Sequence, residues 1–384
     1  MTTFHVIGDA FVDLFCYLKG SWPEHGGDAC LERPVQIFAG GSSFNTATHL
    51  ETLLKERGEN ARVVLHTVFN PTDDHGRVLV DHAASHNLNI VNCYKQSEGD
   101  TDDTTNSYNS TGHCVAVVSN GERSFMTHRG CVANFTADDL NLESIADFDG
   151  AVHVHVAGYF NVEGFWNGKL AERLQHLIAQ RRKLRRLHKT TISMVVQHDA
   201  TNQWDGGLDD LIPFVDFLIM NELEADRIAE ARSSRQHHHG SANDMTVSRY
   251  KRWINSFSSV GSVKTVFVVT RGAEGAVAFQ KDAEITRISP AICVDVVDPT
   301  GAGDAFAAGF LFGLWSFSNQ EERKDTVVDE VGDHSRWSTE AIREALFWGC
   351  AAGTSSVRIR GASVPSKPDA ILEIYQRQKQ VDSE

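Results

Sequence analysis

The fold of the chain is decided most clearly at residues 296–310, VVDPTGAGDAFAAGF, where an aspartate follows two closely spaced glycines. Asp298 precedes a proline and ends an extended run, because the residue before proline avoids helical backbone angles. Gly301 and Gly303 lack bulk, so the backbone there can turn and approach a ligand closely. A helix beginning near Gly303 or Asp304 is predicted by apolar residues at helical spacing, namely Phe306, Phe310, Leu314 and Phe317.

The start of this helix favours an anion, since the first N–H groups of a helix have no partner within it. We therefore expect Gly301, Ala302 and Gly303 to form an anion hole for a phosphoryl group in transfer. Asp304 then suits the acceptor alcohol, whose proton a neighbouring carboxylate can accept as a general base. Helix capping alone is the competing explanation for this aspartate. Phe306 stands where a dinucleotide fingerprint needs its third glycine, and no P-loop motif is present.

The rest of the chain alternates between strand-like and helix-like segments. Short apolar runs occupy residues 4–10, 61–69, 151–158, 191–199, 215–220 and 263–270. Helical patterns lie between most of them, at residues 42–58 and 164–183 for example, and the first places Phe44, Ala47, Leu50 and Leu54 on one stripe. This alternation predicts an α/β fold with a central, mostly parallel sheet flanked by helices, and ligands beyond the carboxyl ends of its strands.

Two stretches interrupt the alternation, residues 11–38 and 90–130. The second contains short strand-like pieces, beginning with IVNCYK at residue 90 and joined by polar turns. We expect both stretches to build a discontinuous β lid, with residues 1–10, 39–89 and 131–384 forming the α/β nucleotide- and substrate-binding core. The polar segments 230–244 and 318–338 are predicted to be loop-like insertions of unassigned role, although the first contains three histidines.

Composition excludes several classes of protein. The 384 residues have a formal net charge of −15, which argues against a broad nucleic-acid-binding face. The basic run at residues 181–189 is interpreted as the solvated end of a surface helix. Seven scattered cysteines favour free thiols in a reducing compartment. Neither a signal peptide nor a membrane-spanning run is recognised, so we expect a cytoplasmic protein, with an organelle left open.

Five motifs in a fixed order make the chain resemble the ribokinase-like (PfkB) family of carbohydrate kinases. They are GDAFVD (8–13), AGGSSFNTATHL (39–50), NELEAD (221–226), VTRGAEGAVAF (269–279) and DPTGAGDAFAAGF (298–310). The resemblance covers about residues 4 to 365 and implies a ribokinase-like fold with a small β-sheet lid. It implies an ATP-dependent phosphotransferase in which Asp304 is the catalytic base and Gly301, Ala302 and Gly303 form the anion hole.

The other site residues follow from the same resemblance. The acceptor substrate is assigned to Asp13, Gly40, Gly41 and Asn45. The nucleotide is assigned to Asn221, Thr270, Gly272 and Gly275 and, less directly, to Ala352, Gly353 and Ser356. Glu224, with Asn221, is implied to organise Mg²⁺ through water near the ATP phosphates. Many members also use a monovalent cation at a loop that Asp298 and Thr300 match, so K⁺ is a further expected ligand.

The acceptor is defined less sharply than the reaction. Ser42 stands where ribokinase itself has a lysine, and SNGERSFMTHRG (119–130) resembles the lid segment of sugar kinases. Arg123 and Arg129 are long enough to reach an acidic sugar, but the pocket is not strongly basic. We expect a neutral sugar, a pentose or a ketose, with a nucleoside of the adenosine type as the alternative. A non-catalytic sugar- or nucleotide-binding regulator is a further alternative, and a homodimer formed through the lid is also expected.

Overall fold

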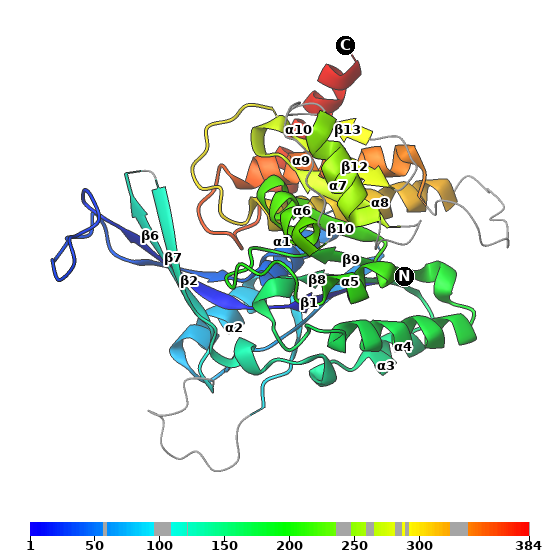
Figure 1. Ribbon diagram of the computed structural model, residues 1–384, viewed down its shortest axis with the longest axis horizontal. Coiled ribbons are helices and arrows are strands. Elements are labelled where there is room, and N and C mark those ends of the chain that lie inside the picture. The colour runs from blue at the N-terminus through cyan, green and yellow to red at the C-terminus, as the bar shows by residue number, and fades with distance from the viewer. Residues whose placement is uncertain are drawn as a thin grey trace.

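The computed structural model describes residues 1–56, 60–95, 109–120, 122–235, 247–258, 265–280, 286–288, 292–322 and 337–383. Within these ranges the protein is an α/β body with a smaller sheet projecting from one side (Figure 1). Of the two predicted insertions, residues 236–244 and 323–336 lie outside the described residues. Residues 230–235 and 318–322 are helical, in α6 and α8, so the prediction of loops is wrong for these residues.

The described part of the chain forms a large sheet of nine strands, in the order β13-β12-β11-β10-β9-β8-β1-β4-β5. Their bounds are β1 Thr2–Gly8, β4 Ala61–Thr67, β5 Asn89–Asn92, β8 Ala151–Ala157, β9 Thr190–Val195, β10 Phe217–Asn221, β11 Val266–Thr270, β12 Ala276–Gln280 and β13 Thr286–Ile288. The seven strands from β11 to β5 in this order run parallel, whereas β12 and β13 are antiparallel to their neighbours. The predicted mostly parallel sheet is therefore confirmed.

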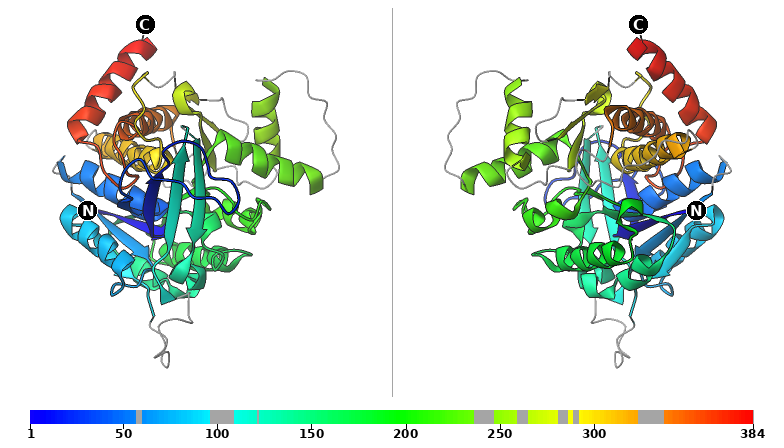
Figure 2. Two further views of the ribbon diagram at one scale, coloured as in Figure 1. Left: turned by 90° about the vertical axis from the view of Figure 1, so that its left-hand side faces the viewer. Right: turned by 90° about the vertical axis from the view of Figure 1, so that its right-hand side faces the viewer.

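Helices cover both faces of this sheet and enclose two apolar cores. One core is covered by α1 (Ser42–Glu56), α2 (Asp74–His86), α8 (Ala302–Glu322), α9 (Thr339–Ser356) and α10 (Pro368–Ser383). The other is covered by α3 (Leu142–Asp147), α4 (Lys169–Lys183), α5 (Leu208–Leu211), α6 (Glu222–Arg235) and α7 (Val247–Ser258). In β10, Phe217 and Ile219 enter the first core while Leu218 and Met220 enter the second, because side chains alternate along a strand. The α6–α7 pair projects from the body in both views of Figure 2.

Helix α8 is fixed by unusually close packing against α9. A Cβ atom on Gly309 would lie 2.4 Å from the Trp348 carbonyl oxygen, and one on Gly313 would lie 2.8 Å from Ala345 Cα. Glycines at these positions let the two helices approach until backbone meets backbone. The helix begins at Ala302, one residue before the predicted start, so Asp304 lies in its first turn. The packing therefore fixes the carboxylate on which the predicted chemistry depends.

The smaller sheet contains four strands among the described residues, in the order β3-β2-β6-β7. These are β3 (Gln36–Gly40), β2 (Phe11–Tyr17), β6 (His113–Ser119) and β7 (Glu122–His128). Strands β2 and β6 pair in parallel, and the two outer pairs are antiparallel. The strand expected from residue 90 onward does not join this sheet: β5 pairs with β4 and extends the large sheet instead.

The basic run at residues 181–189 is also less solvated than predicted. Arg181 is fully buried. Its guanidinium donates to the carbonyl oxygens of Phe148 and Gly150 and to Thr190 Oγ1. Burial lowers the pKa of this guanidinium from its ordinary value. The interpretation as a solvated helix end therefore fails at the first residue of the run, because neighbouring carbonyl groups supply the acceptors that water would otherwise provide.

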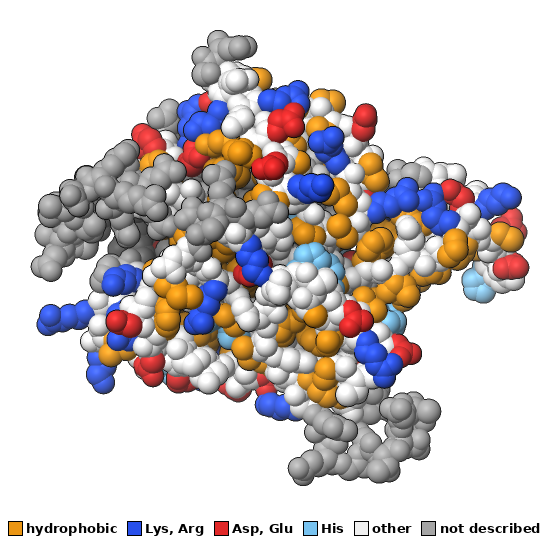
Figure 3. Space-filling model, turned by 180° about the vertical axis from the view of Figure 1, so that it is seen from behind, with side chains coloured by type: hydrophobic (Ala, Val, Ile, Leu, Met, Phe, Trp, Pro, Cys, Tyr) orange, Lys and Arg blue, Asp and Glu red, His pale blue; other side chains and the backbone are white. Residues whose placement is uncertain are grey.

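The structure also describes the cysteines, the apolar character of the helices and the surface charges. All seven cysteines are free thiols, with Cys131 and Cys350 buried and Cys30 and Cys293 exposed. Within the described ranges, no helix combines the length and the apolar character needed to cross a bilayer. On the face shown in Figure 3, lysine and arginine side chains are interspersed with aspartate and glutamate rather than gathered in one basic surface.

Candidate active site

Three side chains from two chain segments converge on the carboxylate of Asp304, which is 4% exposed. Ser42 Oγ donates to Oδ1 at 2.7 Å, and Gln197 Nε2 donates to the same oxygen at 3.0 Å. Asn45 Nδ2 donates to Oδ2 at 2.8 Å. The donors come from the first turn of α1 and from the second residue after the end of β9, so the site lies at the carboxyl edge of the large sheet.

These contacts set the charge of Asp304. Burial raises its pKa to about 6, while the hydrogen bonds from Ser42, Asn45 and Gln197 lower it and so limit the increase. Donors lower the pKa of a carboxyl group because they stabilise its ionised form. A group with this pKa is mostly ionised at neutral pH and can accept a proton from an alcohol.

The predicted anion hole lies at the open end of α8. Gly301 has φ 76°, in the left-handed region, and a Cβ there would lie 2.6 Å from Ala362 Cβ. Any other residue would strain the backbone and collide with this neighbour. Gly303 is exposed, and a Cβ built on it would meet nothing within 4 Å. Gly303, next to Asp304 in the first turn of the helix, therefore borders open space, while the Ala302 N–H donates to the Pro299 carbonyl oxygen at 3.3 Å.

The two glycines before α1 accommodate Asp13. A Cβ on Gly40 would lie 2.3 Å from Asp13 Oδ2, so the carboxylate lies directly against the glycine backbone. Gly41 has φ 93°, and its Cβ would lie 2.7 Å from Ala10 Cα. Burial, followed by the charges of Asp304, Asp9 and Asp298, raises the pKa of Asp13 to about 7. The structure thus places Asp13 against Gly40 and within electrostatic reach of three other carboxylates.

Asn45 has one further property that suits an acceptor site. Its amide nitrogen is used by Asp304, but its Oδ1 is buried and has no hydrogen-bond partner among the described residues. A buried carbonyl oxygen without a partner is costly, because it has lost its water without compensation. A hydroxyl group of a bound substrate could donate to this oxygen.

Sequence reasoning missed Asp9, a fully buried carboxylate beside Asp13. Asn161 Nδ2 donates to its Oδ2 at 2.6 Å, and the Ser43 backbone N–H donates to its Oδ1 at 3.2 Å. Burial raises the pKa of Asp9 to about 7, against the lowering effect of the Asn161 amide. A Cβ on Gly158 would lie 2.5 Å from Asp9 Oδ1, so this carboxylate also requires a neighbouring glycine.

Gln197 was also missed. Its side-chain amide donates both to Asp304 and, at 3.0 Å, to Ser42 Oγ. Its backbone has φ 65°, a left-handed conformation that is uncommon outside glycine. The conformation was the signal that could have identified Gln197, and it is visible only in three dimensions. Gln197 therefore helps to hold the Asp304 carboxylate in place.

Asn221 and Glu224 form a reciprocal pair at the start of α6. The Asn221 backbone N–H donates to Glu224 Oε2, and the Glu224 backbone N–H donates to Asn221 Oδ1, both at 2.9 Å. This is a capping arrangement, the structural explanation that competes with a metal role. Glu224 is nevertheless 6% exposed, and burial raises its pKa to about 7, with a further contribution from the charge of Asp304.

The predicted nucleotide residues lie along neighbouring strand ends and on α9. Thr270, at the end of β11, pairs with Asn221 at the end of β10. Gly272 and Gly275 follow in a tight turn with φ 52° and φ 81°. On α9, Ala352 is buried against Gly309 of α8 and Ser356 Oγ donates to the Gly353 carbonyl oxygen, so these two side chains are engaged within the helix packing. Gly353 itself lies against the Ala302 carbonyl oxygen.

The loop before the anion hole holds the two residues expected to bind K⁺. Asp298 Oδ1 accepts from the backbone N–H and the hydroxyl of Thr300 at 3.0 and 2.7 Å. Arg123 of the small sheet also donates to Asp298 Oδ1, at 3.0 Å, and to Thr300 Oγ1. Arg129 forms an ion pair with Glu163. Both lid arginines therefore have protein partners.

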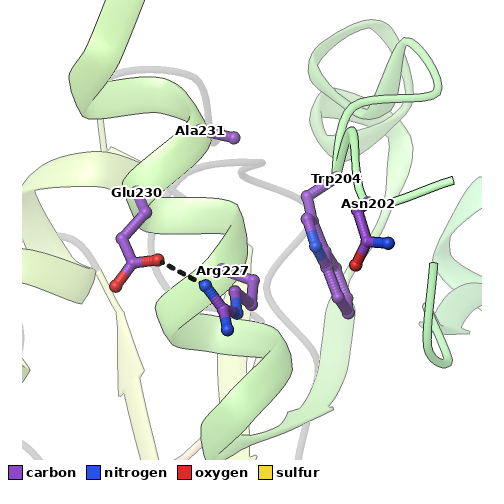
Figure 4. A pocket seen from close by; sticks show the side chains of 5 residues that line it. All are labelled: Asn202, Trp204, Arg227, Glu230 and Ala231. Atoms are coloured by element: carbon purple, nitrogen blue, oxygen red, sulfur yellow. Dashed lines mark hydrogen bonds and ion pairs between the residues drawn. The ribbon is translucent and has the colours of Figure 1, made fainter. Parts of the chain in front are cut away.

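A separate pocket of about 350 Å³ lies between Trp204 and the middle of α6 (Figure 4). It is lined by Asn202, Trp204, Arg227, Glu230 and Ala231. Its charged groups, Arg227 and Glu230, are 3.3 Å apart and pair with each other. None of the residues predicted for the site lines this pocket.

The comparisons with known proteins agree with this geometry. A model described as pfkB family carbohydrate kinase matches residues 1–369, and the chain belongs to this family. The protein is therefore an ATP-dependent phosphotransferase with the ribokinase-like fold that the motifs predicted.

Curated relatives include kinases of two kinds. An adenosine kinase of Dictyostelium discoideum is 25% identical over 313 residues, covering 81% of this chain and 80% of the relative. An adenosine kinase of Schizophyllum commune is 26% identical over 320 residues, covering 80% of this chain and 83% of the relative. A probable chloroplastic fructokinase-6 of Arabidopsis thaliana is 38% identical over 103 residues, covering 27% and 22%.

Solved structures share the fold over nearly the whole chain. Ribokinase from Giardia lamblia superposes with a TM-score of 0.74 at 17% identity, covering 97% of this chain and 99% of that one. Ribokinase from Cryptococcus neoformans var. grubii, in complex with ADP, gives a TM-score of 0.65 at 21% identity, covering 97% and 99%.

Proposed function

We propose that this kinase transfers the γ-phosphoryl group of ATP to a hydroxyl of a neutral sugar, a pentose or a ketose. The observation that carries the proposal is the Asp304 carboxylate, which is buried, held by three donors and placed in the first turn of α8 beside open space. Asp304 orients the acceptor hydroxyl and takes its proton late in the transfer. Gly301 and Gly303 present N–H groups to the phosphoryl oxygens, and the Ala302 N–H joins them by giving up its hydrogen bond of 3.3 Å to the Pro299 carbonyl oxygen.

The acceptor is proposed to lie between Asp13 and Asn45. The Asp13 carboxylate accepts hydrogen bonds from sugar hydroxyls, and the partnerless Oδ1 of Asn45 accepts another. Gly40 lets the Asp13 carboxylate lie against the backbone, because a side chain there would collide with it, and Gly41 lies too close to the Ala10 backbone to carry a side chain. The pocket presents acidic and amide groups, which favours a neutral, hydroxyl-rich acceptor over a phosphorylated one.

ATP is proposed to lie across the ends of β10 and β11, along Asn221, Thr270, Gly272 and Gly275, with Gly353 of α9 nearby. Among the described residues there is no group of three or more His, Cys, Asp or Glu residues that could hold a metal by themselves. A single buried carboxylate, Glu224, still fits a Mg²⁺ ion that arrives with the nucleotide and keeps most of its waters. Such an ion would neutralise charge on the phosphates, and Glu224 would orient its water shell.

The small sheet is proposed to act as the lid of the site. Strands β2 and β3 carry Asp13 and Gly40 directly, so movement of this sheet assembles or opens the acceptor pocket. Closure excludes water, which is a competing phosphoryl acceptor. The proposed lid consists of strands β2, β3, β6 and β7, so it includes residues 39 and 40, which the sequence assigned to the core.

A nucleoside is the second candidate acceptor. The observation that favours it is the coverage of the curated relatives, since the adenosine kinases match most of the chain and the fructokinase matches about a quarter of it. A ribose carried by a base would place the same type of hydroxyl at Asp304. The two candidates differ in what lies beyond the sugar, under the lid.

The test is acceptor-dependent formation of ADP from ATP and Mg²⁺, with pentoses, ketoses, hexoses and nucleosides offered singly. Asp304→Asn keeps the shape of the side chain and removes the proton acceptor. We expect its turnover to fall at least ~100-fold with nucleotide binding little changed. Turnover close to that of the wild type would remove Asp304 from the mechanism. Activity with nucleosides and none with free sugars would select the second candidate.

A further inference from the structure

The small sheet contacts the loop that precedes the anion hole through one charged side chain. Arg123 lies on β7 in a lateral row with Val118 and Tyr17, and pairing residues of neighbouring strands face the same side of a sheet. Asp13 faces that side too, since residues 13 and 17 of one strand alternate in phase. From this side the guanidinium reaches Asp298 Oδ1, 175 positions along the chain, at 3.0 Å.

Asp298 is the centre of that loop. Its Oδ1 accepts hydrogen bonds from Arg123 and from the backbone N–H and hydroxyl of Thr300, and its Oδ2 accepts one from the backbone N–H of Gly361 at 3.2 Å. Its backbone N–H donates to the Val357 carbonyl oxygen at 3.0 Å. The carboxylate is 6% exposed, and among these four donors Arg123 is the charged one. The geometry of the loop leading into Gly301 therefore depends on a buried negative charge.

These contacts bear on the K⁺ ion that the sequence predicted for Asp298 and Thr300. The side-chain oxygens of both residues already accept hydrogen bonds from the same guanidinium. A monovalent cation bound to these oxygens would have to displace Arg123 and would meet its positive charge. The side chains present do not fit the predicted ion.

We propose that the guanidinium of Arg123 supplies the positive charge of the anion-hole loop in place of a monovalent cation and ties that loop to the small sheet. This inference rests on the proposed function, because it assigns Arg123 a positioning role toward Gly301–Gly303. A guanidinium is permanently charged and donates in a planar fork, so it matches a carboxylate and a neighbouring hydroxyl at once. Unlike a free ion, it reaches the loop only when the small sheet lies against it.

The test compares three variants in salts of different cations. Arg123→Ala removes the guanidinium, Arg123→Lys retains a charge, and Arg129→Ala removes a nearby lid arginine whose partner is Glu163. Acceptor-dependent ADP formation is measured in tetramethylammonium chloride, in KCl and in tetramethylammonium chloride with added guanidinium, at constant ionic strength. The thermal unfolding midpoint is recorded in the same salts.

We expect the wild type and Arg129→Ala to show the same activity and the same midpoint in tetramethylammonium and in K⁺. Arg123→Ala should lose about 10-fold or more in turnover in tetramethylammonium, the direction expected when a buried carboxylate loses its charged partner. K⁺ or guanidinium should restore much of that loss and raise the unfolding midpoint of this variant. The turnover of Arg123→Lys in tetramethylammonium should lie between that of Arg123→Ala and that of the wild type.

Three results would overturn the proposal. They are a wild type that requires K⁺, an Arg123→Ala enzyme that keeps full activity in tetramethylammonium, and a folded Arg123→Ala enzyme that neither cation restores. A wild type that forms no ADP with any acceptor would defeat the proposed function instead. In that case the thermal unfolding midpoint of Arg123→Ala, compared between KCl and tetramethylammonium chloride, would still decide whether a cation replaces the guanidinium.

Discussion

Replacing Ser42 by alanine should move the acidic limb of the pH profile without removing activity. The Ser42 hydroxyl donates to Asp304 Oδ1 at 2.7 Å, and both residues are 4% exposed. A hydrogen bond to a charged group contributes about 1.5–3 kcal/mol, and one pKa unit corresponds to about 1.36 kcal/mol. Loss of this donor should therefore raise the pKa of Asp304 from about 6 by about 1 to 2 units.

The sign follows from the active form of the base. The ionised form of Asp304 accepts the proton, and the Ser42 hydroxyl stabilises this form. Removal of the hydroxyl therefore lowers the ionised fraction of Asp304 at a given pH. At pH 7 the fraction should fall from about 90% to between about 50% and 10%. We expect kcat/KM to fall about 2- to 10-fold at pH 7 and to approach the wild-type value near pH 9.

The assay is the pH dependence of kcat/KM for acceptor-dependent ADP formation, with Ser43→Ala as the matched control. The Ser43 hydroxyl donates at 2.6 Å to the backbone carbonyl of Asp9, so its loss should leave the limb in place. If Ser42→Ala lowers kcat/KM equally at every pH and the acidic limb does not move, the assignment of that limb to Asp304 is refuted.

Three further results are expected. Gly40→Ala places a Cβ 2.3 Å from Asp13 Oδ2 and should displace this carboxylate. We expect kcat/KM for the acceptor to fall about 100-fold, the scale of loss for a displacement near 1 Å. Nucleotide binding, measured separately, is the control. Arg181→Ala leaves buried carbonyl groups without donors and should lower the free energy of unfolding by about 3 kcal/mol in urea denaturation, while turnover per folded molecule stays unchanged. A homodimer through the small sheet is expected, because an apolar row of paired residues crosses its four strands, namely Ile37, Leu14, Val115 and Met126. The side residues of this row, Ile37 and Met126, are 52% and 50% exposed. A monomeric mass by light scattering would contradict this expectation.

The sequence was sufficient wherever a local pattern determines the structure. The stripe on residues 42–58 predicted a helix, and its four apolar members are each at most 1% exposed in α1. The helix that carries Asp304 was predicted to within two residues, because glycines, proline and apolar spacing all mark the same boundary. The prediction that the strand near residue 90 joins the small sheet failed, because a strand of four residues has too short a pattern to indicate which of two sheets it joins.

Contacts between distant segments were beyond such patterns. Gln197 lies 155 positions from Ser42 and 107 from Asp304, and no periodicity links them. Arg181 was expected in solvent and Arg123 was considered only as long enough to reach an acidic sugar, but each meets acceptors supplied by remote loops. Charge and length identify an arginine that can reach a partner, whereas the topology decides which partner it meets.

The central position of β1 has a consequence for how the chain folds during synthesis. Residues 2–8 pair on one side with β4 and on the other with β8, whose last residue is Ala157. A ribosome adding about 5–20 residues per second needs roughly 8–30 s to make the intervening chain. During that interval one edge of the first strand lacks its final neighbour, and newly made chains present it to chaperones or to one another. Slowing translation between β4 and β8 should therefore lower the yield of soluble protein more than an equal delay after residue 157.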